Sequence, residues 1–139
     1  MNRFSAQSKE RLESCHIDLQ ELFTEVLRYY DCSIIEGHRS RERQAELYNK
    51  GLSKVTESKH NQSPSLAVDV APYLLGGIHW EDIPSFYQFA GAVLVIAQQL
   101  LEAGKISHRV RWGGDWNSDR LSLDETFQDC VHFELLTVH

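Results

Sequence analysis

Apolar residues recur at steps of three and four positions in two long stretches of the chain, which is the spacing of an amphipathic helix. The first stretch covers residues 6–30, and we predict a helix there whose apolar face packs on a core. The second opens near Pro84, a residue suited to the first turn of a helix, and stops at Gly104. A shorter helix, capped by Ser40 and ended by Gly51, is predicted between them.

Four short segments have the composition or the period-two alternation of β-strands. They are residues 32–36, 66–71, 108–112 and 131–136. In the second segment Asp69 lies between two alanines on one face, which leaves room for a bound group. The order of helices and strands predicts an α+β fold, in which a small, mainly antiparallel sheet packs with about three helices.

Composition limits the class of protein. The 139 residues, 42% of them hydrophobic and 24% charged, are typical of a single globular domain. A formal net charge of −6 argues against binding nucleic acid through a basic surface. The longest apolar run is far shorter than the ~20 residues that span a bilayer, and the first residues lack the apolar stretch of a signal peptide. The three cysteines cannot all pair with one another, and we expect them to be reduced.

His60, Asp69 and His132 are candidate metal ligands, because two imidazoles and one carboxylate suit a catalytic zinc that keeps a fourth position for water. Their spacing alone does not bring them together, so scattered polar positions remain the alternative. Alternation in the last strand places His132 and Glu134 on the face opposite to Phe133. If the two strands are neighbours, Asp69 and His132 share a polar face.

Four blocks of sequence follow one another in order. They are GHRS at 37–40 followed by Gln44, Leu47, Tyr48 and Gly51, then SKH at 58–60 leading to AVDVAPY at 67–73, WGGDW at 112–116, and DCVHFEL at 129–135. Together they resemble the zinc peptidases related to D-alanyl-D-alanine carboxypeptidases and dipeptidases, and among these the phage and bacterial L-alanyl-D-glutamate endopeptidases. The resemblance covers residues 37–135 and leaves out residues 1–36, which are mostly the predicted N-terminal helix.

The resemblance implies a role for each matching residue. His60, Asp69 and His132 match the zinc ligands, so one Zn²⁺ per chain is expected. Asp129 matches the catalytic acid/base, and Arg39 matches the arginine that contacts the substrate or the developing oxyanion.

Three further residues are candidates for binding substrate. Ser58 matches a serine near the metal, with a supporting or a substrate-binding role. Trp112 and Trp116 flank a glycine turn and are candidates for a wall of the substrate groove, although packing in the core is an equally good interpretation. The acidic segment 115–129 lacks the regular spacing of a calcium-binding loop, and we interpret it as solvated.

Cys130 and Glu134, on either side of the candidate ligand His132, are alternatives for the roles of metal ligand and catalytic base. In a regular strand Cys130 faces the same side as His132, and Asp129 faces the other side. Asp129 therefore reaches the metal only if the backbone bends around Cys130 or the strand begins near Val131. A thiolate at Cys130 is a rival ligand, and Glu134 is a rival base or a partner of a metal ligand.

The implied function is zinc-dependent cleavage of the peptide stem of bacterial peptidoglycan, at the L-alanyl-D-glutamate bond, by a phage or prophage endolysin. The alternatives are a D-alanyl-D-alanine carboxypeptidase or dipeptidase, and a catalytically silent protein that binds zinc or wall peptide. We expect a monomer that neither inserts into membranes nor binds nucleic acid. It would be made in the host cytoplasm and reach the wall through a pore formed by a separate protein.

Overall fold

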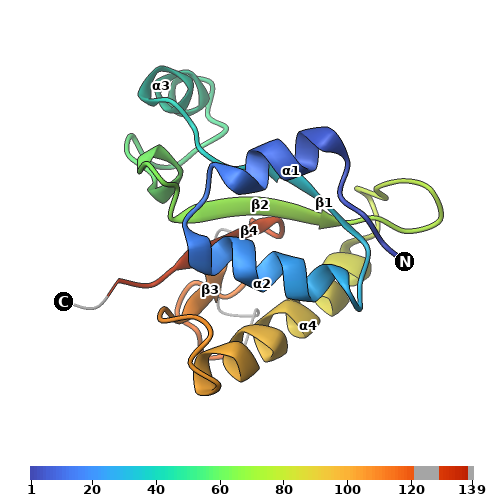
Figure 1. Cartoon of the computed structure of the whole chain (residues 1–139). Helices are drawn as coiled ribbons and strands as arrows, with labels where there is room; N and C mark the ends of the chain where they lie inside the picture. Colours follow the sequence, from blue (N-terminus) through green and yellow to red (C-terminus); the bar gives the residue numbers. More distant parts are fainter. Residues whose placement is uncertain (121–128, 138–139) are drawn as a thin grey trace.

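The computed structural model describes residues 1–120 and 129–137, and its centre is a four-stranded antiparallel sheet in the order β1-β2-β4-β3 (Figure 1). The strands are β1 (Cys32–Glu36), β2 (Ala67–Pro72), β3 (Val110–Trp112) and β4 (His132–Leu135). The helices are α1 (Ala6–Glu13), α2 (Ile17–Leu27), α3 (Arg41–Asn49), α4 (Ile83–Glu102) and the short 3₁₀ turn η1 (Lys59–Asn61). This architecture confirms the predicted α+β class. Within these residues, no helix combines the length and the apolarity needed to cross a membrane.

The predicted boundaries of two helices are confirmed by their capping contacts. The Ser40 hydroxyl accepts the Arg43 backbone N–H at 3.1 Å and begins α3. Asp82 caps α4 and places Pro84 in its first turn, where a missing N–H costs nothing. Gly104 follows the end of α4 with φ at 73°, the left-handed conformation that commonly ends a helix.

The prediction of one helix over residues 6–30 was wrong, because the chain breaks there into α1 and α2. Between them the backbone pairs with residue Ser65: the N–H of Ser65 donates to Ser14, and the N–H of His16 donates to Ser65. His16 then caps α2 by accepting the Asp18 N–H at 3.0 Å. A periodic apolar pattern continues across such a break, so periodicity alone does not reveal it.

The core lies between the sheet and helices α2 and α4, which pack against each other. Phe133 of β4 is fully buried there, and its ring meets those of Phe23 and Phe89 edge-on at 5.5 and 6.2 Å. Phe133 alternates with His132 and Glu134 along β4, as predicted. The aromatic contacts therefore fix the position of the strand whose other face carries polar side chains.

The three cysteines are free thiols, as expected. Cys15 and Cys32 are buried in the core, and burial raises the pKa of each thiol to about 12. Both therefore stay protonated near neutral pH and pack as small apolar side chains.

Phe133→Ala removes a fully buried ring with two aromatic partners. We expect it to lower the free energy of unfolding by about 3–5 kcal/mol, the usual cost of such a cavity. Urea denaturation followed by tryptophan fluorescence measures the change. Phe133→Leu, which keeps most of the buried volume, should cost clearly less, and equal losses for the two variants would contradict this account of the core.

Candidate active site

His60, Asp69 and His132 converge on one point, although 72 positions separate the first from the last. Asp69 and His132 are direct partners across the antiparallel pair β2–β4, and η1 brings His60 to the same place. Asp69 Oδ1 lies 3.1 Å from His60 Nε2 and 3.3 Å from His132 Nδ1. All three side chains are buried.

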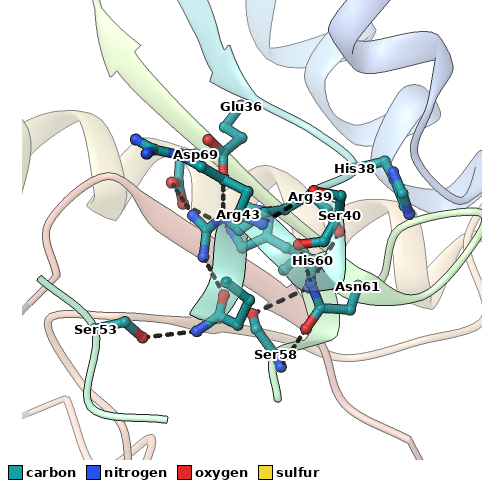
Figure 2. A network of polar contacts seen from close by, with 12 residues as sticks. Glu36, His38, Arg39, Ser40, Arg43, Ser53, Ser58, His60, Asn61 and Asp69 are labelled. Carbon is teal, nitrogen blue, oxygen red and sulfur yellow. Dashed lines mark hydrogen bonds and ion pairs between the residues drawn. The ribbon is translucent and has the colours of Figure 1, made fainter. Parts of the chain in front are cut away.

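The segment around η1 orients His60 (Figure 2). The Ser58 hydroxyl accepts the His60 backbone N–H at 3.1 Å, and the His60 carbonyl accepts the Arg39 N–H at 2.7 Å. The Asn61 side chain donates to the Arg39 carbonyl at 2.8 Å, which is a second bond between η1 and the segment at Arg39. His60 Nδ1 lies 2.7 Å from the Gly37 carbonyl, which can only accept, so this nitrogen carries the ring proton.

Glu134 orients His132 from the opposite side. His132 Nε2 donates to Glu134 Oε1 at 2.9 Å, and the same carboxylate binds Lys59 Nζ at 3.1 Å and an Arg111 guanidinium nitrogen at 2.8 Å. Burial acts to raise the pKa of Glu134, but the contacts with His132 and Lys59 outweigh it and lower the pKa to about 2. Glu134 is therefore a carboxylate that holds one tautomer of His132.

These outer contacts leave three electron pairs facing one another. When both imidazoles are neutral, His60 Nε2 and His132 Nδ1 present lone pairs to the ionised Asp69. Such a buried group of acceptors needs a cation between its members. Ligands of a tetrahedral zinc with bonds of about 2.0–2.1 Å lie about 3.3 Å apart, close to the distances found here. The donor set and its spacing therefore fit a divalent metal of the zinc type.

Without a metal, a proton takes this place. Burial acts to lower the pKa of His132, but its hydrogen bonds to Asp69 and Glu134 raise it to about 9. Burial acts in the opposite sense on Asp69, where the bonds from His132 and His60 hold the pKa well below its usual range. The metal-free site thus contains an imidazolium between two carboxylates, and metal binding must release that proton.

The three residues open onto a cavity of about 740 Å³ that is also lined by Asp129, Arg39 and Trp116. The strand β4 begins only at His132, and Asp129 lies in the preceding turn, where its carbonyl accepts the His132 N–H at 3.1 Å. The alternation that would turn Asp129 away from the site therefore does not apply to it. Burial raises the pKa of Asp129 above its ordinary value, and the charge of Asp69 adds to this effect.

Gly113 permits the backbone to approach Asp129 closely. The Asp129 N–H donates to the Gly113 carbonyl at 2.8 Å, and the Gly113 N–H donates to His132 at 2.8 Å. A Cβ atom at position 113 would lie 2.2 Å from the Asp129 carbonyl oxygen. Only glycine fits there, so the WGGDW block positions the turn that carries Asp129.

Arg39 lies at the junction of β1 and α3, as predicted, and three groups hold its guanidinium (Figure 2). It contacts Glu36, donates to Gln44 Oε1 at 2.7 Å, and lies 3.6 Å from Asp69 Oδ2. Gln44 is fully buried and also donates to Ser53 and to the Val55 carbonyl. Sequence reasoning did not assign a role to Gln44, although a fully buried amide in an otherwise polar helix is unusual.

Comparison with known proteins identifies the family of this chain. The family model of the phage L-alanyl-D-glutamate peptidases matches residues 1–136. The chain belongs to this family. The match is wider than the blocks in residues 37–135, because it includes both N-terminal helices.

Two relatives of this peptidase cover nearly the whole chain. The L-alanyl-D-glutamate peptidase of Escherichia phage T5 is 28% identical over 141 residues, covering 96% of this chain and 98% of that protein. The crystal structure of the Serratia marcescens L-Ala D-Glu endopeptidase ChiX has a TM-score of 0.74 and 31% identity, covering 97% of this chain and 91% of the other.

The two candidate groove tryptophans of the peptidase lie in different surroundings. Trp116 lines the cavity, with its ring 5.3 Å from that of His132 and beneath the Arg111 guanidinium. Trp112 is buried in the core cluster, donates its indole N–H to the Cys130 carbonyl at 2.9 Å, and does not line this cavity. Cys130 is half-buried against the same core and is not part of the metal-binding group of described residues.

Part of the acidic segment 115–129 is described. The prediction of a solvated segment was wrong at Asp115, which is buried because its carboxylate accepts the backbone N–H groups of Asp119 and Arg120 at 3.2 and 2.7 Å. Residues 121–128 lie outside the described part of the chain, so the prediction of a solvated segment stays untested there.

The pKa of His132 predicts how pH acts on the metal-free peptidase. Its proton stabilises the fold fully below the unfolded-state pKa of about 6.5, and this contribution is lost as pH rises through about 9. We expect the free energy of unfolding to fall by up to about 3 kcal/mol between these values. Urea denaturation in the presence of a chelator at both pH values measures it.

The matched control is His132→Gln, which keeps a polar side chain but has no proton to lose in this range. The metal-free variant should show a smaller difference between the two pH values than the parent. An identical pH dependence in parent and variant would contradict the assigned role of His132.

Proposed function

We propose that this chain is a zinc-dependent endopeptidase that cleaves the peptide stem of bacterial peptidoglycan at the L-alanyl-D-glutamate bond. The observation that carries the proposal is the convergence of His60, Asp69 and His132 on a cavity also lined by Asp129. The relatives from phage T5 and Serratia marcescens, whose names state this activity, support the choice of bond.

His60, Asp69 and His132 would hold one zinc ion and leave a fourth position open for water or substrate. When bound, zinc supplies a Lewis acid for the scissile carbonyl and lowers the pKa of the attacking water to about 7. Glu134 acts as the positioning residue for His132, because its charged partners Lys59 and Arg111 keep it ionised and aimed at Nε2.

Asp129 is the proposed general base and acid. It lines the cavity beside the metal-binding group, in a turn held by backbone hydrogen bonds to Gly113 and His132. Its carboxylate takes a proton from the attacking water and passes it to the departing amine. Burial raises the pKa of Asp129 towards neutral pH. A pKa near the working pH suits a group that must both accept and donate a proton.

Arg39 is the proposed contact for negative charge on the substrate. Glu36 and Gln44 hold its guanidinium at the edge of the cavity, so little side-chain freedom remains to be lost on binding. A fixed, permanently charged fork stabilises the oxyanion that forms at the scissile carbonyl or clamps a substrate carboxylate. Trp116 forms a flat wall beside His132 against which the peptide can pack, and Ser58 contributes through the placement of His60.

The biological setting belongs to the same proposal. A relative from a phage favours a phage or prophage endolysin, whose partner is the peptide stem of the wall. A separate pore-forming protein would give this monomer access to its substrate.

Mass analysis of defined wall peptides tests the proposed bond. Digestion should yield fragments with a new D-glutamate amino terminus, while the terminal D-alanine stays attached. Release of free D-alanine or its dipeptide would instead favour a carboxypeptidase or dipeptidase. Zinc binding without turnover would favour a silent binding protein. His60→Ala, which should lose both zinc and turnover, is the negative control.

Asp129→Asn should separate catalysis from metal binding. Asparagine has nearly the same size but cannot take a proton, so we expect turnover to fall by at least about 10²-fold. Zinc content, measured by elemental analysis, should match the parent, because Asp129 is not part of the metal-binding group.

Cys130→Ser is the matched control for that variant, because the thiol is adjacent in the chain but packs against the core. It should keep both zinc and rate, with a modest loss of stability. Loss of zinc in Cys130→Ser together with full activity in Asp129→Asn would exchange the roles of the two residues.

Arg39→Lys should lose much of the activity although it keeps the charge. Lysine cannot contact Glu36 and Gln44 while presenting a planar fork to the substrate. Steady-state kinetics on wall peptides measures the loss, and zinc content should stay at the level of the parent. Full activity in this variant would remove Arg39 from the proposed mechanism.

A further inference from the structure

A second group of metal-binding side chains lies at the start of α2. His16, Asp18 and His108 offer two imidazole nitrogens and one carboxylate oxygen, all within 4.8 Å of one another. His16 is the cap of α2, Asp18 lies in its first turn, and His108 precedes β3. None of the three lines the cavity of the proposed active site.

Asp18 supplies a buried negative charge to this group. Its side chain is only 8% exposed, and its Oδ2 atom accepts three hydrogen bonds from described residues. The backbone N–H and the hydroxyl of Ser107 donate at 2.9 and 3.0 Å, and His108 Nδ1 donates at 2.6 Å. An ionised carboxylate fixed in this way is a preorganised ligand.

The two imidazoles flank that carboxylate and remain accessible. Their rings lie edge-on with centroids 5.0 Å apart, and both side chains are half-buried. His16 Nδ1 accepts the Asp18 backbone N–H, the capping position that serine, threonine, aspartate or asparagine usually fills. A histidine caps the helix no better than these residues, but its Nδ1 lone pair can bind a metal ion in exchange for the hydrogen bond from the Asp18 N–H.

We propose that His16, Asp18 and His108 form a second site for a divalent transition metal of the zinc type. Two imidazoles and a carboxylate favour such ions over calcium or magnesium, which prefer oxygen ligands. The ion would replace the Nδ1 proton of His108, which moves to Nε2 of the same ring. Ligands of a tetrahedral zinc lie about 3.3 Å apart, so the 2.6 Å contact between His108 and Asp18 must open by less than about 1 Å.

The second site binds more weakly than the first. His108 Nδ1 is hydrogen-bonded to Asp18 Oδ2 and His16 Nδ1 to the Asp18 backbone N–H, and both bonds must be given up. The two imidazoles are also more exposed than the buried rings of His60 and His132. A metal here links α2 to the loop that leads into β3, and β3 pairs with β4, which carries His132. Its occupation is therefore expected to raise thermal stability without taking part in catalysis.

Zinc stoichiometry and zinc-dependent thermal unfolding test the site in the intact chain. With zinc well above the concentration that fills the first site, the parent should bind two ions per chain, and His108→Ala should bind one. His60→Ala, in which the first site is broken, should still bind one zinc and melt at a higher temperature in its presence. His132→Ala gives the same test if His60→Ala does not fold.

His38→Ala is the matched control, because His38 is an exposed histidine outside the group. It should keep two ions, which separates the proposed site from adventitious binding to surface histidines. A parent that binds only one zinc, or a His60→Ala/His108→Ala variant that still binds one, would overturn the proposal. Neither result bears on cleavage of wall peptides, so the proposed function is tested separately.

Discussion

Two imidazole lone pairs and one ionised carboxylate meet in a buried pocket of this peptidase, and that arrangement is unfavourable without a cation between them. Each imidazole reaches this state because its other nitrogen is bound to a fixed acceptor, the Gly37 carbonyl for one ring and Glu134 for the other. The cation can be a proton, which explains the raised pKa of His132, or a metal. These outer contacts therefore contribute, together with the three side chains themselves, to the attraction of the site for a cation.

The antiparallel sheet supplies this geometry, because alternate residues of its central strands face the apolar core and the polar site. Phe133 anchors β4 in the aromatic core, and the residues on either side of it in the chain face the polar site. Because β2 and β4 are paired, Asp69 and His132 are held at the distance of neighbouring strands. The catalytic candidates Asp129 and Arg39 come from a turn and a strand–helix junction at the margin of the sheet, where the backbone is free of strand alternation.

The groups around His60 and His108 have the same residue types but differ in burial and in hydrogen bonding. The group around His60 is enclosed, and its nitrogens are directed by partners that only accept hydrogen bonds. The group around His108 is half-open, and its imidazole donates directly to the aspartate. The first arrangement is incomplete without a cation, whereas the second is satisfied by hydrogen bonds and must exchange them for a metal. This difference accounts for the order of affinities proposed for the two sites.

The sequence by itself determined the α+β class and the capped starts of α3 and α4, because caps and alternation act over a few neighbouring residues. It also named His60, Asp69 and His132 as candidate metal ligands, through their residue types and through the resemblance of the ordered blocks to a known family. It did not show the break between α1 and α2. The break depends on backbone hydrogen bonds with the distant residue Ser65, whereas the apolar periodicity of the sequence continues across it. The roles of Gln44 and Gly37 also escaped it, because their partners lie far along the chain. Only the tertiary structure placed Asp129 at the cavity and Cys130 against the core. The start of β4 at His132 depends on backbone bonds to Gly113, and such long-range pairing leaves no local pattern.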